Sequence, residues 1–171
     1  VKTIKENKSL KTIYTFIEKE AVKMDAKELL MKKFKYQPSD MKDFDPQEEE
    51  LLGKYAKKEF NSDFIFITHY PSKKRPFYTM DDPNDPEYTL SFDLLFRGLE
   101  ITSGGQRVHD YHEQVAKMEK LGTDPAQFET YLMLHKYGAP PHGGLGIGLE
   151  RLTMHLLGFK NVREATMFPR D

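Results

Sequence analysis

Hydrophobic positions near the start of the chain recur at helical spacing. Leu10 is followed by Ile13 and Tyr14 at three and four positions, and Ile17 and Ala21 continue the same spacing. This spacing predicts a helix over residues 9–23, with Ser9 as its N-cap. Asp25 and Glu28 have the spacing of a capping box and indicate a short second helix. Asp45, Pro46 and Glu48 indicate the start of a third helix that runs to about Phe60.

The pattern changes after residue 62, where aromatic and β-branched residues become frequent. Three segments are rich in them and predict strands: Asp63–Thr68, Arg75–Thr79 and Ser91–Ile101. Asp81–Pro86 consists entirely of turn-forming residues and predicts a loop.

Helical patterns return after Asp110. One extends to Gly122, a second begins near Asp124 and ends before Gly138, and a third covers residues 150–157. Helices therefore precede and follow a block of strands and do not alternate with them. This order predicts an α+β fold with an antiparallel sheet flanked by helices. Residues 1–40 are expected to form a separate helical appendage, and residues 41–171 the main domain.

Composition narrows the classes of function. A chain of 171 residues with 38% hydrophobic residues can form one domain with a core, and it has no cysteine for disulfides or thiolate metal sites. A net charge of −1 argues against a nucleic-acid clamp, although residues 1–36 are rich in lysine. This basic segment is either a solvated helix face or a surface that follows phosphates. No apolar run reaches membrane-spanning length. We therefore expect no membrane partner, and a cytoplasmic location.

Two carboxylates interrupt the apolar segment Ser91–Ile101. Asp93 and Glu100 would be costly to bury unless they were paired or bound to a metal, and carboxylates suit the Mg²⁺ that a nucleotide carries. Seven residues apart on a regular strand, they would face opposite sides, so a shared metal requires a bulge or kink, for which Gly98 is the natural place. The alternative is an exposed pair balanced by Arg97.

Arg107 follows a flexible turn that contains Ser103, and its planar guanidinium can grip a carboxylate through two parallel hydrogen bonds. The alternative is a surface arginine paired with Asp110. Ser103 and Gln106 are either ligand contacts or turn residues.

The histidines indicate no transition-metal site. His109 and His112 have a possible ligand spacing, but no third ligand accompanies them. His142 lies between prolines and glycines and is expected near the ligand.

The glycine-rich segment Gly143–Arg151 is the most distinctive part of the chain. Its glycines allow close approach of a ligand to the backbone, and Arg151 could stack on an aromatic base. It matches neither the P-loop nor the dinucleotide-binding pattern. A floor for a flat anionic ligand and a purely structural glycine-rich strand both remain open on composition alone.

Several segments together resemble one family. Gly143–Arg151 and the following helix resemble motif 3 of the class II aminoacyl-tRNA synthetases. Glu100–Asp110 is similar to the amino-acid-binding segment of the aspartyl-tRNA synthetases of archaeal and eukaryotic type. Arg75–Met80, Gly138–His142 and Met167–Asp171 fit the same group, and the resemblance covers about residues 45–171.

This resemblance implies an ATP-dependent activation of L-aspartate to aspartyl-adenylate, followed by transfer to tRNA. It implies that Glu100, with Asp93 and Ser103, holds the Mg²⁺ that accompanies ATP. It also implies that Ser103 and Arg107 bind aspartate. The ATP-binding residues would be Glu100, Gly148, Leu149, Glu150 and Arg151, and the catalytic residues would be Glu100, Arg107 and Arg151. The parent enzyme would be a homodimer.

Other parts of the family pattern are not recognisable. They are motif 1, motif 2 with its α-phosphate arginine, and the anticodon-binding barrel. We therefore expect the C-terminal part of the catalytic domain of a longer synthetase, or a truncated relative, that forms no aspartyl-adenylate by itself. The alternatives are a freestanding adenylating relative similar to asparagine synthetase, an asparaginyl-tRNA synthetase, and a non-catalytic paralogue that binds aspartate or ATP.

Overall fold

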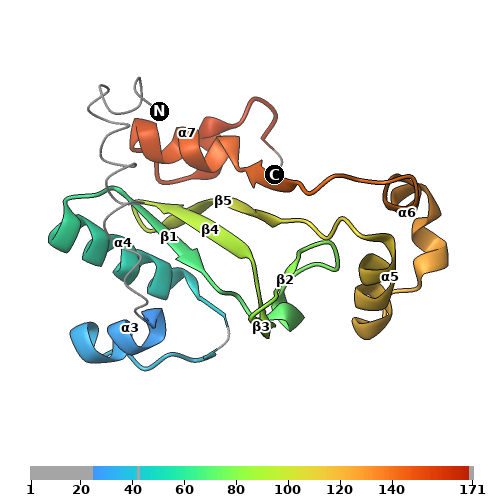
Figure 1. Ribbon diagram of the computed structural model, residues 1–171. Helices are drawn as coiled ribbons and strands as arrows, with labels where there is room; N and C mark the ends of the chain where they lie inside the picture. The colour runs from blue at the N-terminus through green and yellow to red at the C-terminus, as the bar shows by residue number, and fades with distance from the viewer. Residues whose placement is uncertain (1–24, 42, 170–171) are drawn as a thin grey trace, which may run out of the picture. The chain divides into compact units, whose positions relative to one another are not determined.

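The structure is a computed structural model that describes residues 25–41 and 43–169 (Figure 1). Its helices and antiparallel strands confirm the predicted α+β class. The helix predicted over residues 9–23 lies outside the described residues. The chain divides into two compact units. Among the described residues, the first comprises residues 25–41, 43–67, 94–101 and 148–169, and the second comprises Thr68–Asp93 and Thr102–Ile147.

The strands form two sheets. One is four-stranded in the order β1-β4-β5-β6, with β1 at Phe64–Thr68, β4 at Ser91–Phe96, β5 at Leu99–Gln106 and β6 at Gly143–Ile147. The other is a two-stranded hairpin of β2 (Asp81–Asp82) and β3 (Asp85–Thr89). Strands β5 and β6 are antiparallel, and their register runs from Thr102 opposite Ile147 to Gln106 opposite Gly143.

The helices follow most of the predicted boundaries. The α-helices of the described residues are α3 (Ala26–Phe34), α4 (Pro46–Phe60), α5 (Tyr111–Lys120), α6 (Glu129–Lys136) and α7 (Leu149–Leu157). In the same part of the chain there are three short 3₁₀ turns: η1 (Ser72–Lys74), η2 (Pro125–Phe128) and η3 (Val162–Ala165). Within the described part of the chain, none of these helices has the length and apolar character needed to cross a membrane.

In the first unit, α4 begins with the capping box that the sequence predicts. The Asp45 carboxylate accepts a hydrogen bond from the Glu48 backbone N–H at 2.8 Å, and the Glu48 carboxylate accepts one from the Asp45 N–H at 2.9 Å. The first of these bonds holds the pKa of Asp45 below its ordinary value. The box satisfies backbone donors that would otherwise lack a partner at the helix start.

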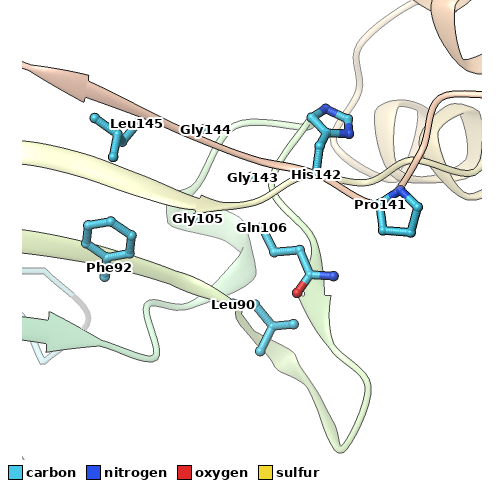
Figure 2. Close-up of a pocket in the computed structure, with 9 residues that line it drawn as sticks. All are labelled: Leu90, Phe92, Gly105, Gln106, Pro141, His142, Gly143, Gly144 and Leu145. Atoms are coloured by element: carbon cyan, nitrogen blue, oxygen red, sulfur yellow. The ribbon is translucent and has the colours of Figure 1, made fainter. Parts of the chain in front are cut away.

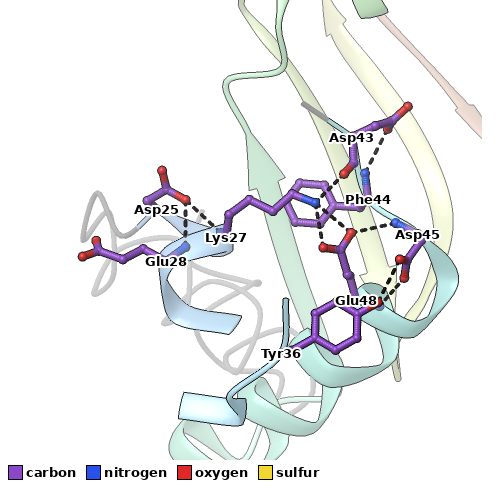
Figure 3. A network of polar contacts seen from close by, with 8 residues as sticks. All are labelled: Asp25, Lys27, Glu28, Tyr36, Asp43, Phe44, Asp45 and Glu48. Atoms are coloured by element: carbon purple, nitrogen blue, oxygen red, sulfur yellow. Dashed lines mark hydrogen bonds and ion pairs between the residues drawn. The ribbon is translucent and has the colours of Figure 1, made fainter. Parts of the chain in front are cut away.

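Helix α3 packs against α4 through a buried ion pair (Figure 3). Lys27 Nζ lies 2.7 and 2.8 Å from the two carboxylate oxygens of Glu48, also donates to the Asp43 carbonyl, and sits 4.2 Å from the centre of the Phe44 ring. The two partners are 4% and 0% exposed. Residues 25–36 thus contact the third predicted helix directly. The division of the chain at residue 40 stays a prediction.

The segment Ser91–Ile101 forms two strands, so its prediction as one strand was wrong. Arg97 and Gly98 have φ angles of 51° and 82° and form a tight turn between β4 and β5. Two consecutive left-handed residues are typical of a two-residue hairpin turn. The turn lies close to α4, because a Cβ on Gly53 would be 2.4 Å from the Gly98 nitrogen. Glycine at position 53 therefore permits this contact between helix and hairpin.

Two predictions in the second unit also need correction. Arg75–Thr79 is not a strand: the Thr79 N–H donates to the Pro76 carbonyl at 3.0 Å, which makes a turn, and Thr79 forms only a single bridge to Arg107. Asp81–Pro86 is not wholly a loop, because Asp82 pairs with Asp85 across Pro83 and Asn84. The turn signals there were correct, but the hairpin that they close was missed.

Helices α5 and α6 pack together in the second unit. Phe77 contacts the rings of Phe128 and Tyr131 edge-on, and its carbonyl accepts a 2.9 Å hydrogen bond from the fully buried Gln114. Buried Lys117 donates to the Thr79 carbonyl and the Asp81 carboxylate. These contacts fasten residues 77–81 to α5.

Replacing Lys27 by Met is expected to destabilise the protein by about 3–5 kcal/mol, because Glu48 would remain buried without a counter-charge. Urea unfolding of the variant measures this free energy. Lys32→Met is the matched control: it lies on the same helix, and its ion pair with Glu28 is 71% and 52% exposed, so its expected cost is below about 1 kcal/mol. Equal effects of the two substitutions would contradict the buried pair as a stabilising link.

Candidate functional site

The glycine-rich segment forms a strand that runs directly into a helix. Strand β6 ends at Ile147, Gly148 is the N-cap of α7, and α7 begins at Leu149. The Gly148 N–H donates to the Ile101 carbonyl of β5 at 2.7 Å. This bond joins the start of α7 to the strand that carries Glu100.

Glu100 and Arg151 lie together in the first unit. Arg151 Nη1 donates to the Glu100 backbone carbonyl at 2.9 Å and lies 3.7 Å from its carboxylate oxygen. The side chains of Arg151 and Glu100 are 51% and 32% exposed. Leu149 and Glu150 are exposed beside them. The structure thus groups a carboxylate, a guanidinium and the start of a helix at one accessible place.

Asp93 forms a different cluster, in the second unit. Arg75 Nη2 lies 2.7 Å from one Asp93 oxygen, and Ser103 Oγ donates to the other at 2.8 Å. The Arg75 guanidinium also stacks on the Tyr70 ring, 3.7 Å from its centre. Arg97 does not balance Asp93, because its guanidinium pairs with Asp63 at 3.3 Å.

The predicted magnesium ligands differ in how well they suit a metal. Among the described residues, no three or more histidine or acidic side chains gather as a metal site would require. Both Asp93 oxygens already accept hydrogen bonds from protein donors. Glu100 is partly accessible, and its oxygens are of the hard type that Mg²⁺ prefers. The donor set therefore fits a magnesium ion brought by a nucleotide better than a resident ion, and Asp93, Glu100 and Ser103 as its ligands stay a prediction.

Arg107 is held by an aromatic ring. Its guanidinium carbon lies 4.1 Å from the centre of the Tyr78 ring. Within residues 25–41 and 43–169, no carboxylate lies within ion-pair distance of it. The alternative pairing with Asp110 was wrong: that carboxylate caps α5 by accepting from the Glu113 N–H at 2.9 Å, which lowers its pKa. Arg107 is therefore a cation whose anionic partner is not supplied by the described chain.

The charge of Arg107 affects the pKa of Tyr131. Burial raises the pKa of the Tyr131 hydroxyl, and the positive charge of Arg107 acts in the opposite direction. Such a competition places the phenol within the electrostatic range of the guanidinium.

Gln106 and His142 line a pocket of about 680 Å³ with Leu90, Phe92 and Leu145 (Figure 2). Successive residues of a strand point to opposite faces. A Cβ on Gly104 would meet Phe92 and Leu145, whereas one on Gly144 would meet Arg107. Gln106 and His142 thus line the same pocket, and Gln106, two positions from Gly104, points to the sheet face opposite Arg107. Their contact with a ligand stays a prediction.

Sequence reasoning missed three contacting residues. Tyr70, Arg75 and Tyr78 were not assigned contacts, although Arg75–Met80 was part of the family resemblance. Arg75 reaches Asp93 across eighteen positions of sequence, and no local spacing encodes such a contact. The only available signal was the density of aromatic and basic residues in this segment.

Comparison with known proteins gives a consistent result. Residues 2–171 match the family model described as tRNA synthetases class II (D, K and N). The chain is 50% identical over 146 residues to the aspartate–tRNA(Asp/Asn) ligase of Aeropyrum pernix, covering 85% of this chain and 33% of that protein. The chain thus spans about a third of that relative.

Two solved structures are similar to this chain. An aspartyl-tRNA synthetase from Entamoeba histolytica superposes with a TM-score of 0.79 and 43% identity, covering 85% of this chain and 30% of that one. The asparaginyl-tRNA synthetase from Pyrococcus horikoshii, complexed with asparaginyl-adenylate, gives 0.73 and 35% identity, covering 85% and 32%.

Replacing Arg75 by Met is expected to destabilise the protein by about 3 kcal/mol, because Asp93 would be left buried without its partner. Chemical unfolding measures the loss. Arg97→Met removes a guanidinium from the more exposed pair with Asp63, 47% and 31% exposed, and its expected cost is below about 1 kcal/mol. A larger effect of Arg97→Met would contradict this assignment of the two pairs.

Proposed function

Because this chain belongs to the class II tRNA synthetases of the aspartate, lysine and asparagine group, we propose that it is a catalytic-core portion of an aspartate–tRNA ligase. The observation that carries the proposal is Arg107, a half-buried cation stacked on Tyr78 with no carboxylate partner among the described residues. A planar guanidinium in this state suits the side-chain carboxylate of aspartate.

The proposed reaction has two steps. An oxygen of the aspartate α-carboxylate attacks the α-phosphorus of ATP, the bond to the β-phosphate bridging oxygen breaks, and aspartyl-adenylate and pyrophosphate form. A hydroxyl of the terminal tRNA ribose then attacks the aspartyl carbonyl carbon, and AMP leaves. Such displacements depend on positioning and charge neutralisation. Guanidinium and carboxylate groups of the kind present here supply both.

We assign the roles residue by residue. Arg107 binds the aspartate side chain, with Ser103 beside it. Glu100 and Arg151 bind ATP together with Gly148, Leu149 and Glu150. Magnesium carried by ATP would be held by Glu100 and Ser103 and would neutralise phosphate charge. Asp93, which is paired with Arg75 and bonded to Ser103, would then hold Ser103 in place.

The partners follow from this role. They are ATP, L-aspartate and a tRNA for the whole enzyme, with a homodimer as its form and the cytoplasm as its location. An asparaginyl-tRNA synthetase is the second candidate, because one of the similar structures carries that name. A cation at position 107 favours aspartate, since the amide of asparagine would turn an N–H₂ group toward charged donors.

Calorimetry on the 171-residue chain tests the assignment. The chain is expected to bind a stable aspartyl-sulfamoyl-adenosine more tightly than the asparaginyl form. Arg107→Gln is expected to weaken binding of the aspartyl form by about 10–100-fold, the cost of losing a charged hydrogen-bonded partner. Arg163→Gln, at an exposed arginine of η3, is the control and should leave binding unchanged.

Two results would contradict this account. Binding of the aspartyl form that survives Arg107→Gln would remove Arg107 from the site. Aspartate-dependent ATP–pyrophosphate exchange by this chain alone would contradict the expectation that motif 2, which is not recognisable here, is needed for activation.

A further inference from the structure

The backbone at Arg107 is pinned on two sides. Its own N–H donates to the His142 carbonyl at 3.0 Å, and the N–H of the next residue, Val108, donates to the Tyr78 carbonyl at 3.0 Å. Residue 107 also forms a bridge with Thr79. Arg107 therefore projects from a fixed point between the segment that carries Tyr78 and the strand that carries Gly144.

The side chain of Arg107 occupies space that a larger residue at position 144 would need. A Cβ on Gly144 would lie 2.9 Å from Arg107 Nε, 2.9 Å from Nη2 and 3.3 Å from Cζ. These distances are well inside van der Waals contact. The guanidinium thus lies directly against the bare backbone of β6, while its carbon is 4.1 Å from the centre of the Tyr78 ring.

Neither of these contacts uses the charge of Arg107 in an ion pair. Stacking on a ring holds a guanidinium while leaving its N–H groups directed outward in its plane. Since no carboxylate of the described chain pairs with Arg107, its position depends on Tyr78 and on the absence of a side chain at 144.

We propose that Tyr78 and Gly144 are positioning residues that hold the Arg107 guanidinium and thereby make the site select a carboxylate over an amide. This inference rests on the proposed function, which assigns the substrate side chain to Arg107. A held guanidinium cannot withdraw when an amide N–H₂ faces it, so asparagine leaves charged donors unmatched. A loosened guanidinium can turn aside and admit the amide.

The chain contains a matched pair of glycines for the test. Gly144 and Gly146 are two positions apart on β6 and so point to the same face. A Cβ on Gly146 would meet nothing within 4 Å, whereas one on Gly144 would displace only the flexible end of Arg107. Gly144→Ala is thus expected to fold normally and to shift the guanidinium, with Gly146→Ala as its control. Tyr78→Leu removes the ring, and Tyr78→Phe keeps it.

Two measurements on the whole 171-residue chain are needed. NMR measures the upfield ring-current shift of the Arg107 side-chain resonances, which reports the stack on Tyr78 without any ligand. Calorimetry measures the ratio of affinities for the aspartyl and asparaginyl sulfamoyl-adenosines. The wild-type ratio is expected to be about 100-fold, falling below about tenfold in Gly144→Ala and Tyr78→Leu. Gly146→Ala and Tyr78→Phe should keep both the shift and the ratio.

The outcomes separate the two proposals. Retention of the shift and the ratio in Gly144→Ala, or an equal loss in Gly146→Ala, would overturn the positioning role. A wild-type chain that shows the ring-current shift but binds neither compound would overturn the proposed function, and with it the role of Tyr78 and Gly144 in selection. The positioning role is supported if Gly144→Ala and Tyr78→Leu lose both the ring-current shift and the affinity ratio, while Gly146→Ala and Tyr78→Phe keep them.

Discussion

The antiparallel pairing of β5 with the glycine-rich β6 is the constraint on which the candidate site depends. The register places Gly144 opposite Gly105 and Gly146 opposite Ser103. Because these β6 positions carry no side chain, the sheet face beside Ser103 and Arg107 is bare backbone. A long cation can lie flat against such a surface. The glycine-rich segment is therefore a strand whose bare backbone at Gly144 accommodates the Arg107 side chain, and its role as a floor for a ligand stays a prediction.

The charged residues that the sequence singles out are in three distinct states. Asp93 is neutralised within the protein, by Arg75 and a hydrogen bond from Ser103. Glu100 and Arg151 form an accessible, loosely spaced pair. Arg107 is stabilised by a ring and by backbone. A paired and buried carboxylate such as Asp93 can hold neighbouring side chains in place. Glu100, Arg151 and Arg107 can exchange their present contacts for contacts with a ligand.

Much of the secondary structure could be predicted because its signals are local. Asp45 with Pro46 and Glu48 specified the start of α4 through a capping box. Asp110 and Asp124 marked the starts of α5 and η2, where each is the N-cap residue. The turn at Arg97 was not predicted, because the sequence gives little sign that a non-glycine residue will adopt a positive φ. One strand was therefore expected where a hairpin exists. The strand predicted up to Thr79 was wrong, because the Thr79 N–H donates to the Pro76 carbonyl in a turn. The composition of this segment nevertheless suits a strand.

The sequence named the residues of the candidate site, whose roles stay predictions, but it did not reveal the side chains that they contact. Arg107, Glu100 and Arg151 were recognisable from their motifs, whereas the Tyr78 stack and the Arg75 ion pair arise from contacts between separate segments. A crystal structure of the chain with bound aspartyl-sulfamoyl-adenosine tests the central claim most directly. The account predicts that both guanidinium edge nitrogens of Arg107 lie within about 3 Å of the aspartyl side-chain carboxylate, with the guanidinium still against Gly144. A ligand bound elsewhere, or an aspartyl carboxylate out of reach of Arg107, would contradict it.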